Sequence, residues 1–326
     1  MEMGKLPSHV LEDLVISAIK NRRDEVVERS GIGKDCAVVD YGDKYCVLSS
    51  DPITGAEKNI GKIAVHVACN DIAAGGAEPI ALLMTILAPV GTTEDTIHEI
   101  MVEANEASKG INVEIVGGHT EITNAVNRMV LSMTAIGMKS KQMTFEKAVP
   151  GDYVLMTKTA GMEGSAIIAE EKAATLLECG FSQGELEEAK EFLNALSVVT
   201  EGLIGAKVGV KYMHDITEGG VEGAVWEGAN ALGLGVNLYE DQIPVSDVTK
   251  KICECFDIYY GKLISSGAML MVVEPMKYQE LREALAKKSI QVTRIGELTD
   301  QGVKILKNGQ WLEIEEPGSD ELYRVI

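Results

Sequence analysis

The chain has 326 residues, 46% of them hydrophobic and 25% charged, a composition typical of a globular protein with room for two domains. Its 50 Asp and Glu residues outnumber 30 Lys and Arg, for a formal net charge of -20 at pH 7. A surface of that sign repels nucleic acid and anionic membranes, so we expect neither as a partner. A phosphorylated ligand is still compatible, provided that glycine-rich backbone or a divalent cation supplies positive potential locally.

The amino-terminal region predicts an amphipathic helix over residues 7–20 in place of a signal peptide, because its apolar residues follow helical spacing. No run of the chain reaches membrane-spanning length. The six cysteines, at positions 36, 46, 69, 179, 253 and 255, lack the spacing of a disulfide framework. We therefore expect reduced thiols and a cytoplasmic protein, with the C-x-C of Cys253 and Cys255 incidental, since a zinc site needs two more ligands.

The remaining elements alternate between helix and strand, which together with 33 glycines and only 5% aromatic residues indicates an α/β protein. A Pro-Gly-Asp turn at Pro150 predicts a boundary between domains 1–149 and 150–326. In the first half we expect a hairpin at 36–50, helices at 59–74 and 93–109, and strands at 80–88, 112–116 and 128–138. In the second half we expect helices at 163–178, 184–207 and 218–232, and strands at 234–238, 268–273 and 291–296.

The hairpin predicts a meeting of two carboxylates. Counting outward from the turn at residues 41–44 pairs residue 40 with about 45 and residue 35 with about 50, so Asp35 and Asp51 meet at the open end. Two like charges raise each other's pKa unless a cation lies between them. The alternative is that both are ordinary turn residues beside strands.

Asp71 adds a third carboxylate. It lies at helical spacing from Ile60, Ala64 and Val67, on a buried stripe with no Lys or Arg within a turn to neutralise it. Three acidic oxygens, with Asn70 beside one of them, suit an octahedral Mg²⁺ that keeps waters and phosphate oxygens as its other ligands. This predicts a nucleotide phosphate nearby.

Glycine-rich turns could hold such a phosphate, although each could equally be a tight turn. They are Gly31-Ile32-Gly33 before Asp35, Gly117-Gly118-His119-Thr120-Glu121 at the end of a strand, and Gly219-Gly220 at the start of a helix. No Walker A or G-x-G-x-x-G fingerprint occurs. In the second half, Thr217 is a natural helix cap, Asp215 is either a capping residue or a fourth site carboxylate, and His214 is a structural neighbour.

The order of these motifs resembles a known superfamily. The stretches are GIGKDCAVVD, SSDPIT, NIGKIAVHVACNDIAAGGAEP, IVGGHTEIT, SMTAIGM, HDITEGGVEGAV, GKLISSGAMLMVV and RIGEL, and they cover nearly the whole chain. They are similar to aminoimidazole ribonucleotide (AIR) synthetase, selenophosphate synthetase, thiamine-monophosphate kinase and the hydrogenase-maturation protein HypE. The resemblance implies a PurM-like fold: an amino-terminal α/β ATP-binding domain that pairs through its sheet with a second subunit, and a carboxy-terminal α/β domain.

The resemblance also implies a site. ATP would lie in the cleft, and Mg²⁺ would bridge its phosphates to Asp35, Asp51 and Asp71, with Asp215 reaching in from the second domain. Asp51 and Asp71 are the expected catalytic residues. Glu121 or Glu218 could contact the metal ligands from the outer shell of the site. The expected nucleotide contacts are Gly33, Asp35, Asn70, Gly117, Gly118, His119 and Thr120. Enzymes of this superfamily transfer a phosphoryl group from ATP to oxygen or selenium, often to an amide oxygen.

The layout is nearest to HypE, whose carboxy-terminal cysteine carries a carbamoyl group. This sequence ends in ELYRVI, with no cysteine beyond Cys255. We therefore expect a HypE-like homodimeric enzyme without the carrier thiol, acting on a small substrate or on a group borne by a maturation-protein partner. The alternatives are a small-molecule kinase of the same superfamily and a nucleotide-binding maturation or regulatory partner without catalysis. The sequence does not indicate the acceptor.

Overall fold

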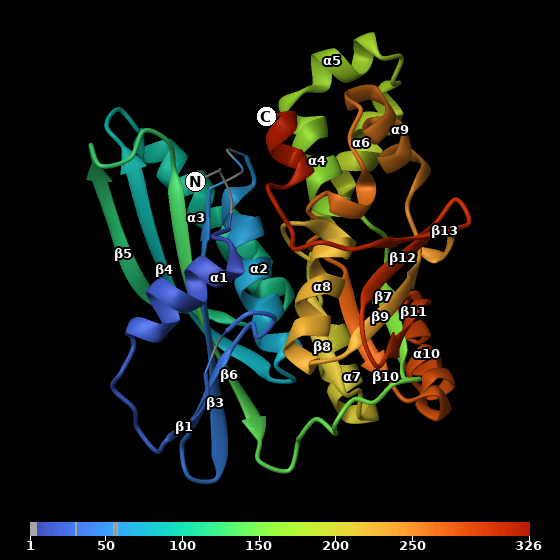
Figure 1. The fold of residues 1–326 in the computed structure, drawn as a ribbon. Helices are drawn as coiled ribbons and strands as arrows, with labels where there is room; N and C mark the ends of the chain where they lie inside the picture. Colours follow the sequence, from blue (N-terminus) through green and yellow to red (C-terminus); the bar gives the residue numbers. More distant parts are fainter. Residues whose placement is uncertain (1–4, 30, 55, 57) are drawn as a thin grey trace.

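Two mixed β-sheets organise the computed structural model, which describes residues 5–29, 31–54, 56 and 58–326 (Figure 1). The first sheet has six strands in the order β1-β2-β3-β6-β4-β5, and only β4 and β5 run parallel. The chain combines helices with two mixed sheets whose strand pairs are mostly antiparallel, so the fold is mixed α/β. The strands are β1 Val26–Glu28, β2 Ala37–Asp40, β3 Lys44–Ile53, β4 Glu78–Pro89, β5 Glu114–Thr123 and β6 Val130–Ser140.

The second sheet has seven strands in the order β13-β12-β9-β11-β7-β10-β8. Its strands are β7 Tyr153–Thr157, β8 Tyr212–Asp215, β9 Gly235–Tyr239, β10 Met269–Val273, β11 Val292–Thr299, β12 Val303–Lys307 and β13 Gln310–Glu313. The predicted boundary at residues 149 and 150 falls in the connection between the sheets. It stays a prediction, because one buried apolar cluster includes residues of both halves.

The helices are α1 Ser8–Val10, α2 Ile60–Ala74, α3 Glu94–Gly110, α4 Met162–Glu171, α5 Ala173–Glu178, α6 Gln183–Glu191, α7 Val199–Val208, α8 Gly220–Leu232, α9 Asp247–Phe256 and α10 Tyr278–Ala286. Helices α2 and α3 agree with the sequence patterns, whereas the helix expected at 7–20 consists of the short α1, a π-helical turn at Leu11–Val15 and a 3-10 turn at Ile16–Ala18. The helix expected at 163–178 is divided at Lys172, and the one expected at 184–207 is interrupted between α6 and α7. No helix of the described residues has the length and apolar character needed to cross a membrane.

Helix α2 lies at the centre of the molecule. It packs on β3, β4 and β6 of the first sheet and contacts α7 and β8 of the second half. All of its residues except Lys62 are buried, which is the pattern of a helix enclosed on every side. The approach of α7 is close, since a Cβ on Gly202 would lie 2.3 Å from the carbonyl oxygen of Ala73. The last turn of α2 is therefore held between the two halves.

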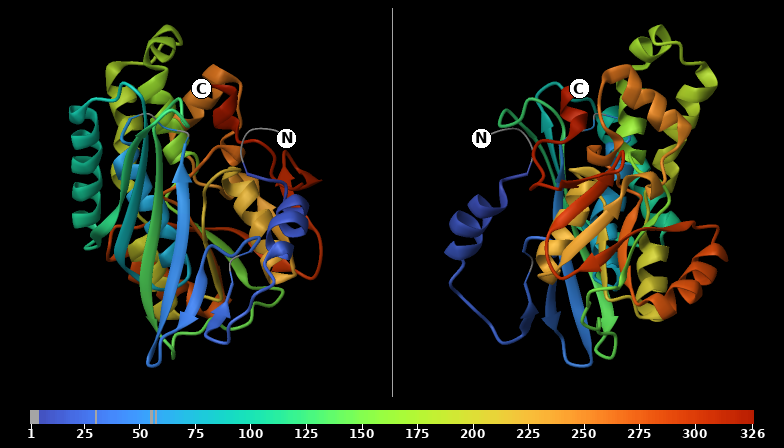
Figure 2. Two further views of the ribbon diagram at one scale, coloured as in Figure 1. Left: turned by 90° about the vertical axis from the view of Figure 1, so that its left-hand side faces the viewer. Right: turned by 45° about the vertical axis from the view of Figure 1, so that its right-hand side comes forward.

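One face of the first sheet carries no helix over β3, β4 and β6 (Figure 2, left). The strands alternate, so that every second residue of β4 is buried against α2 while its neighbours are more accessible. Large apolar side chains are exposed on β4 and β5: Ile80, Leu83, Val116 and Ile122, each between 41% and 52% exposed. An apolar sheet surface of this kind indicates an interaction surface.

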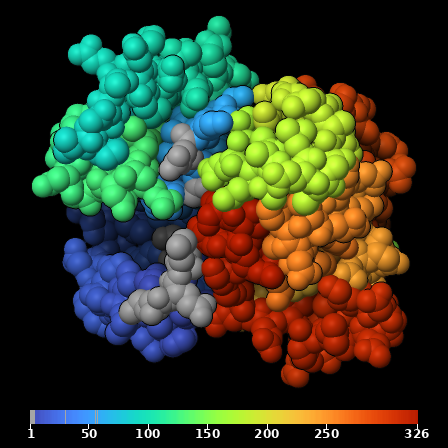
Figure 3. Space-filling view, turned by 90° about the horizontal axis from the view of Figure 1, so that it is seen from above, coloured from blue at the N-terminus to red at the C-terminus, as the bar shows by residue number. Residues whose placement is uncertain are grey.

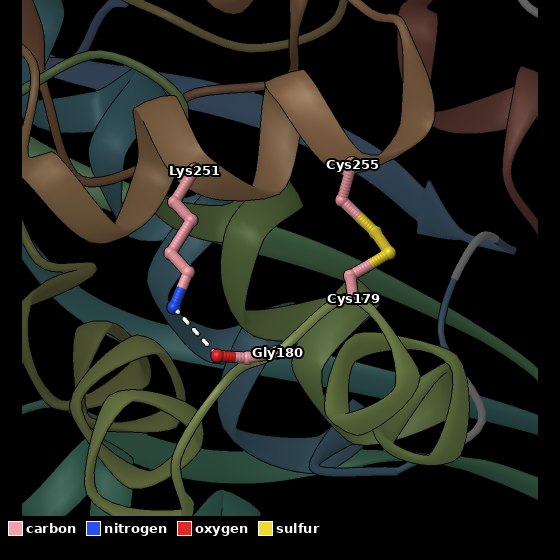
Figure 4. Close-up of a disulfide and its surroundings, with 4 residues drawn as sticks. All are labelled: Cys179, Gly180, Lys251 and Cys255. Atoms are coloured by element: carbon pink, nitrogen blue, oxygen red, sulfur yellow. Dashed lines mark hydrogen bonds between the residues drawn. A yellow bond between two sulfur atoms is a disulfide. The ribbon is translucent and has the colours of Figure 1, made fainter.

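A disulfide joins Cys179, at the end of α5, to Cys255 in the last turn of α9 (Figure 4). The expectation of six reduced thiols, with an incidental Cys255, is therefore wrong for this pair. The two cysteines are 76 residues apart, and no local spacing indicates that their helices pack together. Lys251 strengthens the same junction, because its ammonium donates to the carbonyl oxygen of Gly180 at 3.1 Å.

Reduction of this disulfide should lower the free energy of unfolding by about 2–4 kcal/mol, because the bond closes a long loop in the unfolded chain. Urea unfolding with and without a phosphine reductant measures the difference. The double variant Cys179→Ser/Cys255→Ser is the control and should respond to urea identically in both conditions. Equal midpoints for oxidised and reduced wild type would contradict the prediction.

Candidate active site

Four carboxylates converge where the last turn of α2 meets β8. The register of β2 and β3 pairs Asp40 with Tyr45, as predicted, so Asp35 and Asp51 lie at the same end of the hairpin. Asp71 is in the last turn of α2 and Asp215 is the last residue of β8. Both Asp71 and Asp215 lie within electrostatic range of the other site carboxylates. The structure thus brings together all four residues predicted to bind metal.

These carboxylates repel one another strongly. Asp71 is 8% exposed, and its burial, followed by the charges of Asp215 and Asp51, raises its pKa well above the usual range. Asp215 is 1% exposed, and its burial, followed by the charge of Asp35, raises its pKa to about 7. A cluster of this kind is stable only if it shares protons or binds a cation.

Asp71 is held in place from two sides. The hydroxyl of Ser49 donates a hydrogen bond to Asp71 Oδ2, and the thiol of Cys36 donates to the Asp71 backbone carbonyl at 3.0 Å. Ser49 was not among the predicted site residues. The sequence spacing could have predicted it, because Ser49 is two residues before Asp51 on one strand and therefore lies on the same face of β3.

His214 links the two halves at the site. Its Nδ1 lies 2.7 Å from Asp35 Oδ1, and its Nε2 lies 2.8 Å from Glu227 Oε2 on α8. Burial alone would lower the pKa of the imidazole, but the two carboxylates raise it well above 6.5. Both ring nitrogens therefore lie against carboxylate oxygens, which leaves neither free for a metal ion in this arrangement. Lys5 extends the chain of charges, with its Nζ 3.3 Å from Glu227 Oε1.

The site fits a hard divalent cation. Asp35, His214 and Asp215 are the one group of three metal-ligating side chains among the described residues whose ligand atoms all lie within 4.8 Å of one another. Asp215 Oδ2 is buried and has no hydrogen-bond partner among these residues. Since His214 is already engaged on both sides, the available ligands are carboxylate oxygens, the donors that Mg²⁺ prefers.

Asn70 has a structural position. Its side chain is fully buried, and Nδ2 donates to the carbonyl oxygen of Leu196 at 2.9 Å while Oδ1 accepts from the backbone N–H of Val198 at 2.8 Å. Both ends of the amide therefore tie α2 to the segment before α7. The expected contact between Asn70 and nucleotide stays a prediction.

Gly33 approaches α8 too closely for any other residue. Its φ is +66°, and a Cβ there would lie 2.4 Å from the carbonyl oxygen of Glu227. The Gly33 carbonyl also accepts a hydrogen bond from the Tyr212 hydroxyl at 2.8 Å. This close approach explains why residue 33, two positions before Asp35, is a glycine. A contact between Gly33 and nucleotide stays a prediction.

The turn expected at Gly117–Glu121 is wrong: these residues continue β5, which ends at Thr123. Parallel pairing with β4 extends the strand beyond residue 116, its predicted end. Gly118 is required there, because with φ +146° a Cβ would lie 1.7 Å from the carbonyl oxygen of Met84. His119 and Thr120 are exposed, and His119 Nε2 lies 3.3 Å from Glu121 Oε2.

Gly118 on β5 is three strand spacings away from Asp51 on β3. Asp51 is opposite Met133, Met133 is opposite Met84, and Met84 is opposite Gly118. Three strand spacings amount to about 14 Å. The structure therefore does not bring residues 117–120 to the four carboxylates within one chain, and their contact with nucleotide stays a prediction.

Family models match both halves of the chain. The model of the AIR synthase related protein N-terminal domain matches residues 33–139, and the model of the corresponding C-terminal domain matches residues 149–307. The chain belongs to the AIR synthase-related family. The resemblance deduced from the sequence motifs is thereby confirmed.

Named relatives of this family member are distant but match most of its length. It is 26% identical over 287 residues to a protein of Methanocaldococcus jannaschii named for hydrogenase expression and formation, covering 85% of this chain and 83% of that protein. It is also 26% identical over 270 residues to the carbamoyl dehydratase HypE of Escherichia coli, covering 81% of this chain and 76% of HypE.

Solved structures share the fold over nearly the whole family member. A HypE–HypF complex matches with a TM-score of 0.76 at 23% identity, covering 94% of this chain and 99% of the other. AaThiL complexed with AMPPCP and TMP matches with the same TM-score at 19% identity, covering 98% and 99%. At these identities the structures establish the PurM-like fold alone.

Proposed function

We propose that this protein is an ATP- and Mg²⁺-dependent enzyme that transfers the terminal phosphoryl group of ATP to a small substrate or to a carbamoyl- or amide-type group. One observation carries the proposal: carboxylates from both halves converge, and a buried oxygen of Asp215 lacks a partner among the described residues. The names of relatives support it, since they include a carbamoyl dehydratase and a structure with the nucleotide analogue AMPPCP.

In this proposal Asp35, Asp51, Asp71 and Asp215 hold Mg²⁺, and Asp51 and Asp71 are the catalytic residues. Bound Mg²⁺ would neutralise charge on the transferring phosphoryl group. The chain itself supplies positioning: Ser49 orients the Asp71 carboxylate, and His214 holds Asp35 against α8. Because Asp35 and Asp215 come from different halves, the site is complete only when the halves are packed together.

The same proposal includes the nucleotide contacts and the assembly. Gly33, Asn70 and residues 117–120 are the proposed nucleotide contacts. The exposed apolar face of β4 and β5 supports a homodimer paired through the first sheet, and a sizing measurement that finds a stable monomer would remove this part. The similarity to a HypE–HypF complex supports a maturation-protein partner. A cytoplasmic location is also proposed, although the Cys179–Cys255 disulfide removes the argument from reduced thiols.

Product analysis tests the function. The protein is incubated with Mg²⁺ and ATP, alone and with a panel of alcohols and primary amides as acceptors, and nucleotides and acceptors are separated. ADP with a phosphorylated acceptor would identify a kinase, the candidate favoured by the 25% identity to a thiamine-monophosphate kinase of Pyrococcus abyssi. ADP and free phosphate with a dehydrated or aminated acceptor would identify amide activation. Failure to release ADP under every condition, with nucleotide-dependent binding to another protein, would indicate a non-catalytic partner.

A further inference from the structure

A second carboxyl group of the carboxy-terminal half is buried without a complete set of partners. Glu163 is in the first turn of α4 and only 4% exposed, and its Oε2 has no hydrogen-bond partner among the described residues. A favourable helix dipole explains an acidic residue in a first turn, but it does not explain burial. An unsatisfied buried carboxyl destabilises a protein unless another group binds to it.

The surroundings of Glu163 supply more acceptors than donors. The charged groups acting on it are Asp320, Glu218 and Asp215, all of the same sign. Burial, reinforced by these neighbours, raises the pKa of Glu163 to about 7, and only the hydroxyl of Ser266 opposes the shift. Since Asp215 also belongs to the four-carboxylate cluster, Glu163 lies within electrostatic range of the candidate active site.

The neighbours of Glu163 are already engaged. Asp320 accepts backbone N–H groups from Gly219 at 2.7 Å, Ile264 at 3.1 Å and Leu322 at 2.9 Å. Glu218 accepts the hydroxyl hydrogen of Tyr323. These bonds use the backbone N–H groups and the Tyr323 hydroxyl elsewhere, so the donor that acts on Glu163 is the Ser266 hydroxyl.

A bare metal ion is not the missing partner. Among the residues that the structure describes, the one group of metal-ligating side chains with ligand atoms within 4.8 Å is Asp35, His214 and Asp215, and Glu163 is not part of it. A larger ligand that presents N–H donors can reach one buried carboxylate without needing several ligands around one point.

We infer that Glu163 binds a cationic nitrogen group, an ammonium or an amidinium, on the acceptor of the phosphoryl transfer. That the ligand is the phosphoryl acceptor rests on the proposed function. The binding of a cation to Glu163 does not depend on that function. The nitrogen group binds to Glu163 and thereby positions the acceptor. The reacting oxygen of the same molecule would lie toward Asp215. A net charge of -20 favours such a cation over an anionic acceptor at long range.

The carboxy-terminal turn lies close to Glu163, since Asp320 acts on the Glu163 carboxyl and Glu163 acts on Tyr323. The turn at Glu321–Arg324 carries Leu322, which is 2% exposed, and Pro317 packs on Gly219. The red carboxy-terminal residues lie directly beside the lime residues of α4–α6 (Figure 3).

Saturation-transfer NMR of the full-length protein without nucleotide tests the inference. The probes are ethanolamine and methylguanidinium, each compared with its uncharged counterpart, ethylene glycol or N-methylurea. Wild type should bind the charged member of each pair, and Glu163→Gln should bind it about tenfold or more weakly. The control is Glu178→Gln, an exposed residue on α5, which should behave as wild type. Equal binding of charged and neutral probes by wild type, or unchanged selectivity in Glu163→Gln, would overturn the inference.

Calorimetric titration of Mg²⁺-ATP into the same variants separates this inference from the proposed function. Glu163→Gln should bind Mg²⁺-ATP as wild type does. If neither protein binds nucleotide but the probe selectivity depends on Glu163, then the proposed function fails while the cation site stands. If nucleotide binds and the selectivity is absent, then the cation site fails alone.

Discussion

Replacing Asp71 by Asn should reduce Mg²⁺-dependent ATP turnover by at least about a hundredfold, which is the usual cost of losing one group that stabilises developing charge. The substitution keeps the shape and hydrogen-bonding capacity of the side chain, so Ser49 can still donate to its oxygen. What it removes is the negative charge that would hold the metal. Steady-state release of ADP at saturating Mg²⁺ measures the effect.

The same variant should be as stable as wild type or more stable, because a neutral amide at this position would no longer repel Asp215 and Asp51. Loss of turnover with retained stability would separate a catalytic role from misfolding. Asp43→Asn, in the exposed turn of the β2–β3 hairpin, is the matched control and should keep wild-type turnover. Turnover of Asp71→Asn within twofold of the control would contradict a metal-binding role for Asp71.

Replacing Lys158 by Met should lower the free energy of unfolding by about 3–5 kcal/mol, the usual cost of removing one partner of a buried ion pair. Lys158 Nζ lies 2.7 Å from Glu201 Oε1, and Glu201 is only 1% exposed. The same ammonium donates to three backbone carbonyls, those of Ala195 at 2.9 Å, Ser197 at 2.7 Å and Gly267 at 2.8 Å. The substitution leaves a buried carboxylate and three carbonyls without this donor.

Urea unfolding followed by circular dichroism measures this loss. Lys250→Met is the matched control, because its partner Asp247 is exposed and such pairs contribute little. The double variant Lys158→Met/Glu201→Gln should recover part of the lost stability, since it removes the unpaired charge. A midpoint for Lys158→Met equal to that of Lys250→Met would show that the buried ion pair does not stabilise the carboxy-terminal half.

Local patterns predicted the parts of the fold that depend on local interactions. The β2–β3 hairpin follows from its turn and has the expected register, and α2 follows from its apolar spacing. The predicted end of β5 was wrong. Gly117 and Gly118 are typical of a turn, but parallel pairing with β4 continues the strand through them. The short strands β1, β8, β12 and β13 were missed because they carry weak periodicity, and helices α9 and α10 were missed although their apolar residues follow helical spacing.

Local patterns likewise predicted some of the site residues but none of the contacts that depend on long-range packing. Asp35, Asp51, Asp71 and Asp215 could be predicted because each stands in a motif with a recognisable neighbourhood. The bridge from Asp35 through His214 to Glu227 could not, because it joins the start of the chain to α8 and exists only once the halves are packed. The Cys179–Cys255 disulfide depends on the same kind of long-range packing. Contacts that cross between elements distant in sequence leave no spacing to detect.

Calorimetric titration of ATP, with and without Mg²⁺, into wild type and Asp215→Asn tests most directly whether both halves hold one metal-nucleotide site. Asp215 is the decisive residue because it comes from the second half and has a buried oxygen without a partner among the described residues. We predict binding that requires Mg²⁺ and is at least about tenfold weaker in Asp215→Asn, with Asp43→Asn unchanged. ATP binding that is independent of Mg²⁺, or equal in Asp215→Asn and wild type, would contradict the account.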